Sequence, residues 1–212
     1  LMDIGVSSKQ LDDPERGFSY RYDVKLDMRM NIEQKISAYD VVNTYSEEQL
    51  SKIIFEYGEE RYARKIAKLI VEERKSFPIE KTSDLIALIK RAYPERSSKH
   101  PAKKTFQAIR IEVNRELEVL ENAISKAVEL LKVGGRLAII TFHSLEDRIV
   151  KNKFKDLATA CKCPKDIPIC VCGGVKKFEI ITKKPIIPVD DELKNNNRAH
   201  SSKLRILERI LD

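Results

Sequence analysis

The chain has 212 residues, of which 42% are hydrophobic and 34% charged, a balance that fits a folded globular protein and excludes a disordered or fibrous one. No apolar run approaches the roughly 20 residues of a transmembrane helix, so we expect no membrane partner. Lys and Arg outnumber Asp and Glu by 40 to 33, and the resulting net charge of +7 favours an anionic partner such as nucleic acid.

The first residues predict the end of a buried parallel strand. The apolar Leu1-Met2 is followed at once by Asp3-Ile4-Gly5-Val6-Ser7-Ser8, which is how such a strand brings polar groups to the carboxyl edge of an α/β sheet. Residues 12–30 are rich in charge and contain Pro14 and Gly17, so we expect them to form a loop.

The middle of the chain predicts three short helices. Ser46-Glu47-Glu48-Gln49 is a capping box, and the apolar residues after it recur at helical spacing until Gly58. Two further amphipathic stripes follow, one ending before Pro78 and the other before Pro94. Short helices joined by short turns indicate a small helical subdomain. The next stretch, 90–110, has seven Lys or Arg against one acid, which fits either a solvated surface or a phosphate-binding face.

The second half of the chain has an α/β pattern. A long helix is expected from Pro101 to Leu131, then a strand at 136–142 and a helix that starts near Ser144. Further candidate strands lie at 178–182 and 204–210. Because helix, Gly-Gly turn, strand and capped helix are the αβα rhythm of a parallel sheet, the sequence predicts an α/β sheet interrupted by a helical insertion.

Four segments carry specific motifs. The four segments are 3–20, 26–30, 106–114 and 142–148. Their first residues are, in the same order, Asp3-Ile4-Gly5-Val6-Ser7-Ser8, Leu26-Asp27-Met28-Arg29-Met30, Phe106-Gln107-Ala108-Ile109-Arg110 and Phe142-His143-Ser144-Leu145-Glu146. In this order they resemble the bacterial 16S ribosomal RNA cytosine-N4 methyltransferases, the MraW or RsmH family. The resemblance covers nearly all of the chain.

The resemblance implies an α/β fold, the class I S-adenosylmethionine (SAM)-dependent methyltransferase sheet, which is Rossmann-like and has an inserted helical domain. It assigns 1–28 to the methyltransferase core with the fourth strand and active-site loop, 29–110 to the inserted helical domain, and 111–212 to the C-terminal strands and helices of the core. The family begins with roughly a hundred residues that have no counterpart here, among them three strands and the glycine-rich SAM loop. We therefore expect the N-terminal strands to be missing and this piece alone to be inactive. The seven glycines indeed include no Gly-x-Gly.

The resemblance also implies SAM as the cofactor and the exocyclic N4 amine of a cytosine as the nucleophile. Asp3 matches the family's acidic SAM contact, and Gln10 matches its second contact in this segment. A carboxylate can complement a sulfonium charge and can also accept an N–H of the target amine, so Asp3, or Ser7 nearby, is the candidate catalytic residue. The alternatives are a strand-end Asp that caps the following turn and, for Gln10, a surface amide.

The expected partner is 16S ribosomal RNA in the small ribosomal subunit, in the cytoplasm, and a homodimer is left open. The candidate RNA-binding residues are Arg16, Phe18, Tyr20, Lys99, Lys103 and Lys104. Lys side chains suit phosphates, and aromatic rings suit splayed bases, although core packing fits Phe18 and Tyr20 equally well. His143 follows a strand end, where active sites gather, but a helix-start or packing role is favoured for it.

All four cysteines fall within twelve residues, as Cys161-x-Cys163-Pro and Cys170-x-Cys172-Gly-Gly. In a cytosolic protein such clustering favours metal thiolates over disulfides, and Zn²⁺ with four sulfurs is the natural occupant. The spacing is not the familiar C-x-x-C, and the family is not known as a zinc enzyme. Ordinary thiols or a redox-labile loop therefore stay open as alternatives.

Two other functions compete with RNA methylation. A non-catalytic RNA-binding fragment would explain why the chain lacks the glycine-rich SAM loop. A DNA amino-methyltransferase fits the chemistry, but such enzymes use Asn or Asp followed by Pro-Pro and an aromatic residue, whereas this chain has Asp3-Ile4-Gly5-Val6.

Overall fold

The computed structural model describes residues 1–94, 100–161, 163 and 172–212. They form two units with separate cores: unit 1 is Leu1–Gly5 with Leu117–Asp212, and unit 2 is Val6–Glu116. Residues 6–28, which we expected with the sheet, thus lie in unit 2. The domain limits at residues 28 and 110 stay a prediction. Among the described residues, no helix combines the length and apolar character needed to cross a bilayer.

Unit 1 is built on a four-stranded sheet in the order β1-β2-β4-β3. Its strands are β1 (Met2–Asp3), β2 (Arg136–Thr141), β3 (Phe178–Ile180) and β4 (Lys203–Arg209). β1 runs parallel to β2, whereas β4 runs antiparallel to both β2 and β3. The α/β class is confirmed, but the parallel arrangement holds only for β1 and β2, because the αβα rhythm carries no information on how β3 and β4 return to the sheet.

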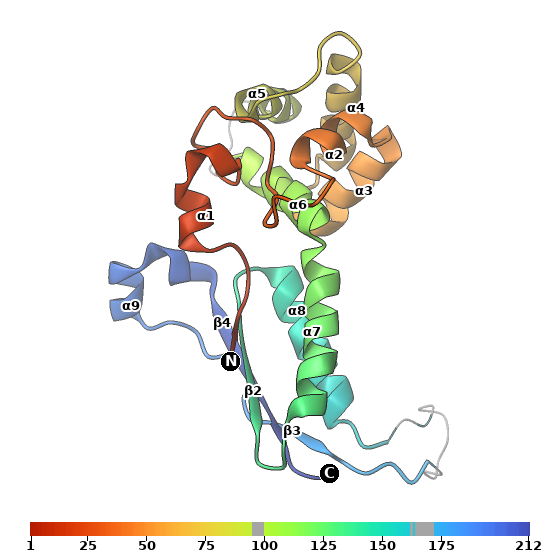
Figure 1. Cartoon of the computed structure of the whole chain (residues 1–212), viewed down its shortest axis with the longest axis vertical. Coiled ribbons are helices and arrows are strands. Elements are labelled where there is room, and N and C mark those ends of the chain that lie inside the picture. The colour runs from red at the N-terminus through yellow and green to blue at the C-terminus, as the bar shows by residue number, and fades with distance from the viewer. Residues whose placement is uncertain (95–99, 162, 164–171) are drawn as a thin grey trace. The chain divides into compact units, whose positions relative to one another are not determined.

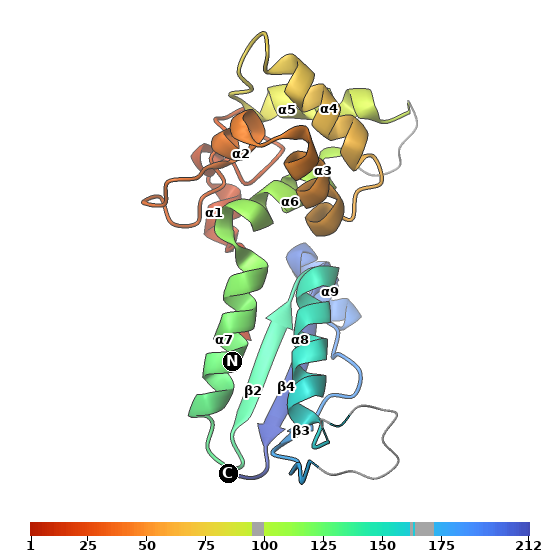
Figure 2. The same cartoon turned by 90° about the vertical axis from the view of Figure 1, so that its right-hand side faces the viewer.

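Helices α7 (Glu116–Leu130) and α8 (Ser144–Ala158) pack on one face of this sheet (Figures 1 and 2). β2 alternates, with Leu137, Ile139 and Thr141 buried, so its apolar side chains meet the two helices. The core consists of Leu120, Ile124, Val128, Leu137, Ile139, Val150, Phe154, Phe178 and Leu207. Two short elements, α9 (Asp190–Asn195) and a 3-10 turn at Asn197–Ser201, precede β4.

Unit 2 is helical. Its helices are α1 (Ser8–Asp12), α2 (Ala38–Thr44), α3 (Glu47–Gly58), α4 (Ala63–Glu73), α5 (Thr82–Ala92) and α6 (Ala102–Asn114), with a 3-10 turn at Pro14–Arg16. The capping box predicted at Ser46 starts α3, and the three predicted helices are present. Where α3 ends, a Cβ on Gly58 would lie 2.8 Å from the Lys104 carbonyl oxygen, so the residue without a side chain lets α3 approach α6.

The long helix predicted from Pro101 to Leu131 is two helices. α6 ends at Asn114, Arg115 has a left-handed backbone with φ of 49°, and α7 begins at the next residue. The hydrophobic spacing continues through the break, so periodicity gives no sign of it. The Asn114 side chain accepts from Met30 N–H at 2.7 Å and donates to the Arg110 carbonyl oxygen at 2.8 Å, and a side-chain bond to a carbonyl four residues earlier competes with the helix ladder.

Candidate functional site

Asp3 lies at the carboxyl end of β1, as predicted. Strand pairing continues to this end, since Ile4 N–H donates to the Ile140 carbonyl oxygen at 3.3 Å. The Asp3 side chain is exposed and, within the part of the chain that the structure describes, has no hydrogen-bond or ion-pair partner. A carboxylate with unused lone pairs at the edge of a sheet can accept hydrogen bonds from an ammonium or an amine.

The turn after β2 lies at the same sheet edge and is closed by Glu146, which is 1% exposed. Its Oε2 accepts from the N–H groups of Phe142 at 2.8 Å and His143 at 3.2 Å. His143 is the N-cap of α8, and its Nε2 lies 3.2 Å from Glu146 Oε1. The helix-start role favoured for His143 is therefore what the structure shows, and it caps the helix that was expected to start near Ser144 and that begins at that residue. Sequence reasoning missed Glu146, although a Glu three residues after a cap is a known signal.

Asp147, the next residue of α8, joins this helix to β4. Arg205 donates to both of its carboxylate oxygens, at 2.7 and 3.1 Å, and Lys203 Nζ lies 3.3 Å from Oδ2. Burial raises the pKa of the Asp147 carboxyl, but the hydrogen bonds and charges of Arg205 and Lys203 outweigh burial and hold the pKa below its usual value. The ion pair thus fixes the start of α8 beside the sheet.

Ser7 and Gln10 lie in unit 2, whereas Asp3 lies in unit 1. Ser7 Oγ accepts from Gln10 N–H at 3.2 Å, and Gln10 Oε1 accepts from Ser7 N–H at 3.0 Å. This reciprocal capping box starts α1. Both side chains therefore have a structural role, and their roles in catalysis and SAM binding stay predictions.

Arg16 and Phe18 both stabilise the loop after α1. Arg16 Nη2 donates to the carbonyl oxygens of Arg29 at 2.6 Å and Met30 at 3.2 Å. Phe18 is 6% exposed and belongs to the core of unit 2, with the Arg16 guanidinium 5.8 Å from its ring centroid. A buried ring has no face for a base, so for Phe18 the structure favours the core-packing alternative.

Tyr20 is half-buried between two other rings. It stacks on His100 at a centroid distance of 4.4 Å and meets Phe106 edge-on at 5.9 Å. Burial, together with the charge of Lys90, lowers the pKa of the His100 imidazole, which favours the neutral ring in this stack. Tyr20 keeps part of its surface exposed, and its binding to RNA stays a prediction.

The predicted phosphate contacts at Lys103 and Lys104 lie in the first turn of α6, and both side chains are exposed. Lys104 Nζ donates to the Glu59 carbonyl oxygen at 2.6 Å, so it also caps the end of α3. Lys99 lies outside the described residues.

The motif residues of 26–30 build a loop that sequence reasoning did not interpret. Arg29 is paired with Asp27 through two hydrogen bonds, at 3.0 and 2.7 Å, and also donates to the carbonyl oxygens of Ile32 and Gln34. Burial raises the pKa of the Asp27 carboxyl, but the bonds and charge of Arg29 outweigh burial and lower it overall. These contacts give Asp27 and Arg29 a structural role in holding the loop.

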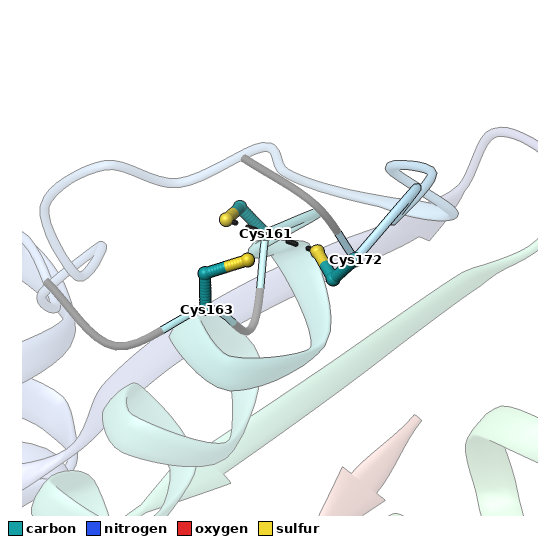
Figure 3. A group of neighbouring side chains, drawn as sticks. All are labelled: Cys161, Cys163 and Cys172. Atoms are coloured by element: carbon teal, nitrogen blue, oxygen red, sulfur yellow. Dashed lines mark hydrogen bonds between the residues drawn. The ribbon is translucent and has the colours of Figure 1, made fainter. Parts of the chain in front are cut away.

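A second group of ligand-type side chains lies beyond α8. The Sγ atoms of Cys161, Cys163 and Cys172 converge in unit 1 (Figure 3), whereas Cys170 lies outside the described residues. These are the described cysteines that could hold a metal ion.

The model of a protein family described as the MraW methylase family matches residues 1–210 of this chain. The chain is 95% identical over 212 residues to "Ribosomal RNA small subunit methyltransferase H" of Fusobacterium nucleatum subsp. nucleatum, covering 100% of this chain and 68% of that protein. Proteins of the same name from Caldicellulosiruptor saccharolyticus and Clostridioides difficile are 58% and 55% identical, covering 99% of this chain and 69% and 68% of theirs.

Proposed function

Because the chain belongs to the MraW methylase family, whose members are class I SAM-dependent methyltransferases, we propose that it methylates the N4 amine of a cytosine in 16S ribosomal RNA. The observation that carries the proposal is the 95% identity to a protein named as a ribosomal RNA small subunit methyltransferase. The small ribosomal subunit is the proposed partner, which would place the protein in the cytoplasm, and a homodimer stays a prediction.

Asp3 and Gln10 are each proposed as a contact for SAM. SAM supplies a methyl group bound to a positively charged sulfur. The exposed Asp3 carboxylate complements such a charge at the sheet edge. Gln10 uses its Oε1 for the capping box, so its amide nitrogen is the group left to donate to the cofactor. No Gly-x-Gly occurs in the 212 residues, so the glycine-rich part of a SAM site is not supplied by them.

Asp3 is proposed to position the amine. The lone pair of a cytosine N4 amine is delocalised into the ring, so the amine is a weak nucleophile and gains from being held at near-attack distance. Asp3 accepts a hydrogen bond from one N–H of the amine. With SAM bound, the methyl on its sulfur would be the group that the amine attacks, and Asp3 would accept the proton that the amine loses. Ser7 is a weaker candidate, because its Oγ already accepts from Gln10 N–H.

Lys103 and Lys104 are proposed to contact RNA phosphates. Both side chains are exposed at the start of α6, although Lys104 Nζ uses one of its N–H groups to bind the Glu59 carbonyl oxygen. Cations that touch phosphates make binding weaken as salt rises. Neutralising both lysines should therefore reduce the salt dependence of methylation. An unchanged salt dependence would identify them as ordinary solvated surface.

The function is tested with the full-length protein, labelled SAM and small subunits that lack the modification. Nucleoside mass spectrometry should detect N4-methylcytidine, separated from 5-methylcytidine by its fragments. The expected loss for Asp3→Asn is about 100-fold in kcat, with an unchanged circular dichroism spectrum because the side chain is exposed. Asp190→Asn, at another exposed carboxylate of unit 1, should retain activity.

The same assays decide between the alternatives. Methyl transfer to DNA in preference to RNA would replace the proposal by a DNA amino-methyltransferase. Binding of RNA without SAM binding or methyl transfer would support a non-catalytic RNA-binding role. Full activity of Asp3→Asn would remove Asp3 from the mechanism and leave Ser7 as the candidate.

A further inference from the structure

Three cysteine side chains converge between α8 and β3 (Figure 3). The Sγ atoms of Cys161, Cys163 and Cys172 all lie within 4.8 Å of one another. The Cys161 and Cys172 sulfurs are 3.8 Å apart, almost twice the length of a disulfide bond, which is about 2.05 Å. These two sulfurs are therefore in hydrogen-bond contact and are not joined by a disulfide.

This spacing matches the ligand shell of a tetrahedral thiolate site. A Zn²⁺ ion with Zn–S distances of about 2.3 Å places neighbouring sulfurs about 3.8 Å apart. The Cys161 to Cys172 distance equals this tetrahedral edge, and Cys163 Sγ lies within 4.8 Å of both sulfurs. We propose that Cys161, Cys163 and Cys172 together bind one structural Zn²⁺ ion as thiolates.

The backbone brings the outer two cysteines together independently of their sulfurs. A Cβ on Gly174 would lie 1.9 Å from the Ala160 carbonyl oxygen, so only glycine allows the chain after Cys172 to pack against the residue before Cys161. Gly173 has a φ of +57°, a region that favours glycine. The two glycines that follow Cys172 thus preorganise the sulfur cluster, which lowers the entropy lost when an ion binds.

The surroundings admit an ion. Cys172 lines a cavity of ≈ 580 Å³ together with Lys153 and Lys177. Cys161 and Cys172 are exposed, which gives the ion a path from solvent. Binding releases the thiol protons and ties the end of α8 to the chain that leads into β3.

The test measures zinc in full-length protein purified with reductant and without an immobilised-metal column. Elemental analysis should find about one Zn²⁺ per chain, and Co²⁺ substitution should give the thiolate charge-transfer band of a tetrahedral site. Cys161→Ser and Cys172→Ser should each lose most of the metal. Thr159→Ala, on the same loop and without a metal ligand, should keep it.

A second measurement uses the unmodified protein, so it does not depend on whether a variant folds. Zinc binding predicts that alkylation of these thiols is slow and becomes several-fold faster after a chelator removes the ion. Equal alkylation rates with and without chelator, together with far less than one Zn²⁺ per chain, would overturn the proposal. A disulfide between Cys161 and Cys172 in a non-reducing peptide map of the reduced preparation would overturn it as well.

Discussion

At the scale of single residues, Asp147 shows how a buried charge depends on its partners. The Asp147 and Arg205 side chains are 12% and 10% exposed, so either group left alone would face a low-dielectric surrounding. Asp147→Asn removes the charge that Arg205 requires, and we expect it to lower the free energy of unfolding of unit 1 by about 3 kcal/mol. Urea unfolding at neutral pH measures this loss.

Lys203→Gln is the matched control, because its side chain is 38% exposed. A surface ion pair of this kind contributes at most about 1 kcal/mol. Equal losses of stability in the two variants would contradict the claim that the buried contact of Asp147 with Arg205 contributes more to stability than its exposed contact with Lys203.

The same carboxyl predicts how stability changes with acid. The folded-state pKa of Asp147 lies below the ordinary value of 3.8, so below that pH the unfolded chain binds more protons than the folded chain. The stabilisation is complete above pH 3.8 and is lost as pH falls through the folded-state pKa. Asp147→Asn should therefore show a shallower loss of stability on acidification, which unfolding curves taken between pH 6 and 2 would measure. Parallel curves for the variant and the unmodified protein would contradict this assignment.

Sequence motifs located most of the candidate residues but did not separate binding from architecture. Asp3 lies at the strand end where the pattern placed it. Phe18 and Arg16 belong to the same motif, yet they fill the core and hold the loop. Whether a loop residue binds a ligand or supports the fold depends on whether its side chain faces solvent or the core. In a segment without helical or strand periodicity, tertiary packing determines this direction, and the sequence pattern does not reveal it.

At the scale of elements, the sequence predicted α3 to α5 because caps, apolar spacing and prolines all agree there. It did not predict the end of α6, where Asn114 makes two contacts that are distant in sequence and one contact to Arg110 in the preceding turn. Its side chain accepts from Met30 N–H and donates to the carbonyl oxygens of Met28 and Arg110, at 2.7, 2.8 and 2.8 Å. The sequence around Asn114 does not indicate a hydrogen-bond partner more than 80 positions away.

Asn114→Ala should release the loop around Met28 and Met30 from α6. Three hydrogen bonds are lost and the Met30 N–H is left without its acceptor, so we expect a destabilisation of about 1–3 kcal/mol. Hydrogen exchange of the peptide covering 28–34 should become faster. Asn31→Ala is the control from the same loop, because its side chain accepts only an exposed Glu33 N–H. Equal exchange in both variants would show that Asn114 does not hold the loop.

At the scale of the whole molecule, each hydrophobic core draws its members from one unit. Every residue of the larger cluster, including Leu50, lies in unit 2, and every residue of the smaller one, including Leu207, lies in unit 1. The chain enters unit 2 at Val6 and returns to unit 1 at Leu117, so sequence continuity alone does not determine which residues share a core. Residues that share a core should therefore be destabilised together, even where they are far apart in sequence.

Leu50→Ala and Leu207→Ala test this directly, because both side chains are 0% exposed. Each truncation removes buried apolar surface and leaves a cavity, at a cost of about 2–5 kcal/mol. Leu50→Ala should accelerate hydrogen exchange in α3 and α6 and leave β2 and β4 unchanged, and Leu207→Ala should do the reverse. Exchange in β1 should respond to Leu207→Ala although Met2 and Asp3 are far from residue 207 in sequence, since β1 joins the sheet through β2. Uniform acceleration in all peptides by either variant would mean that the two cores unfold as one cooperative unit.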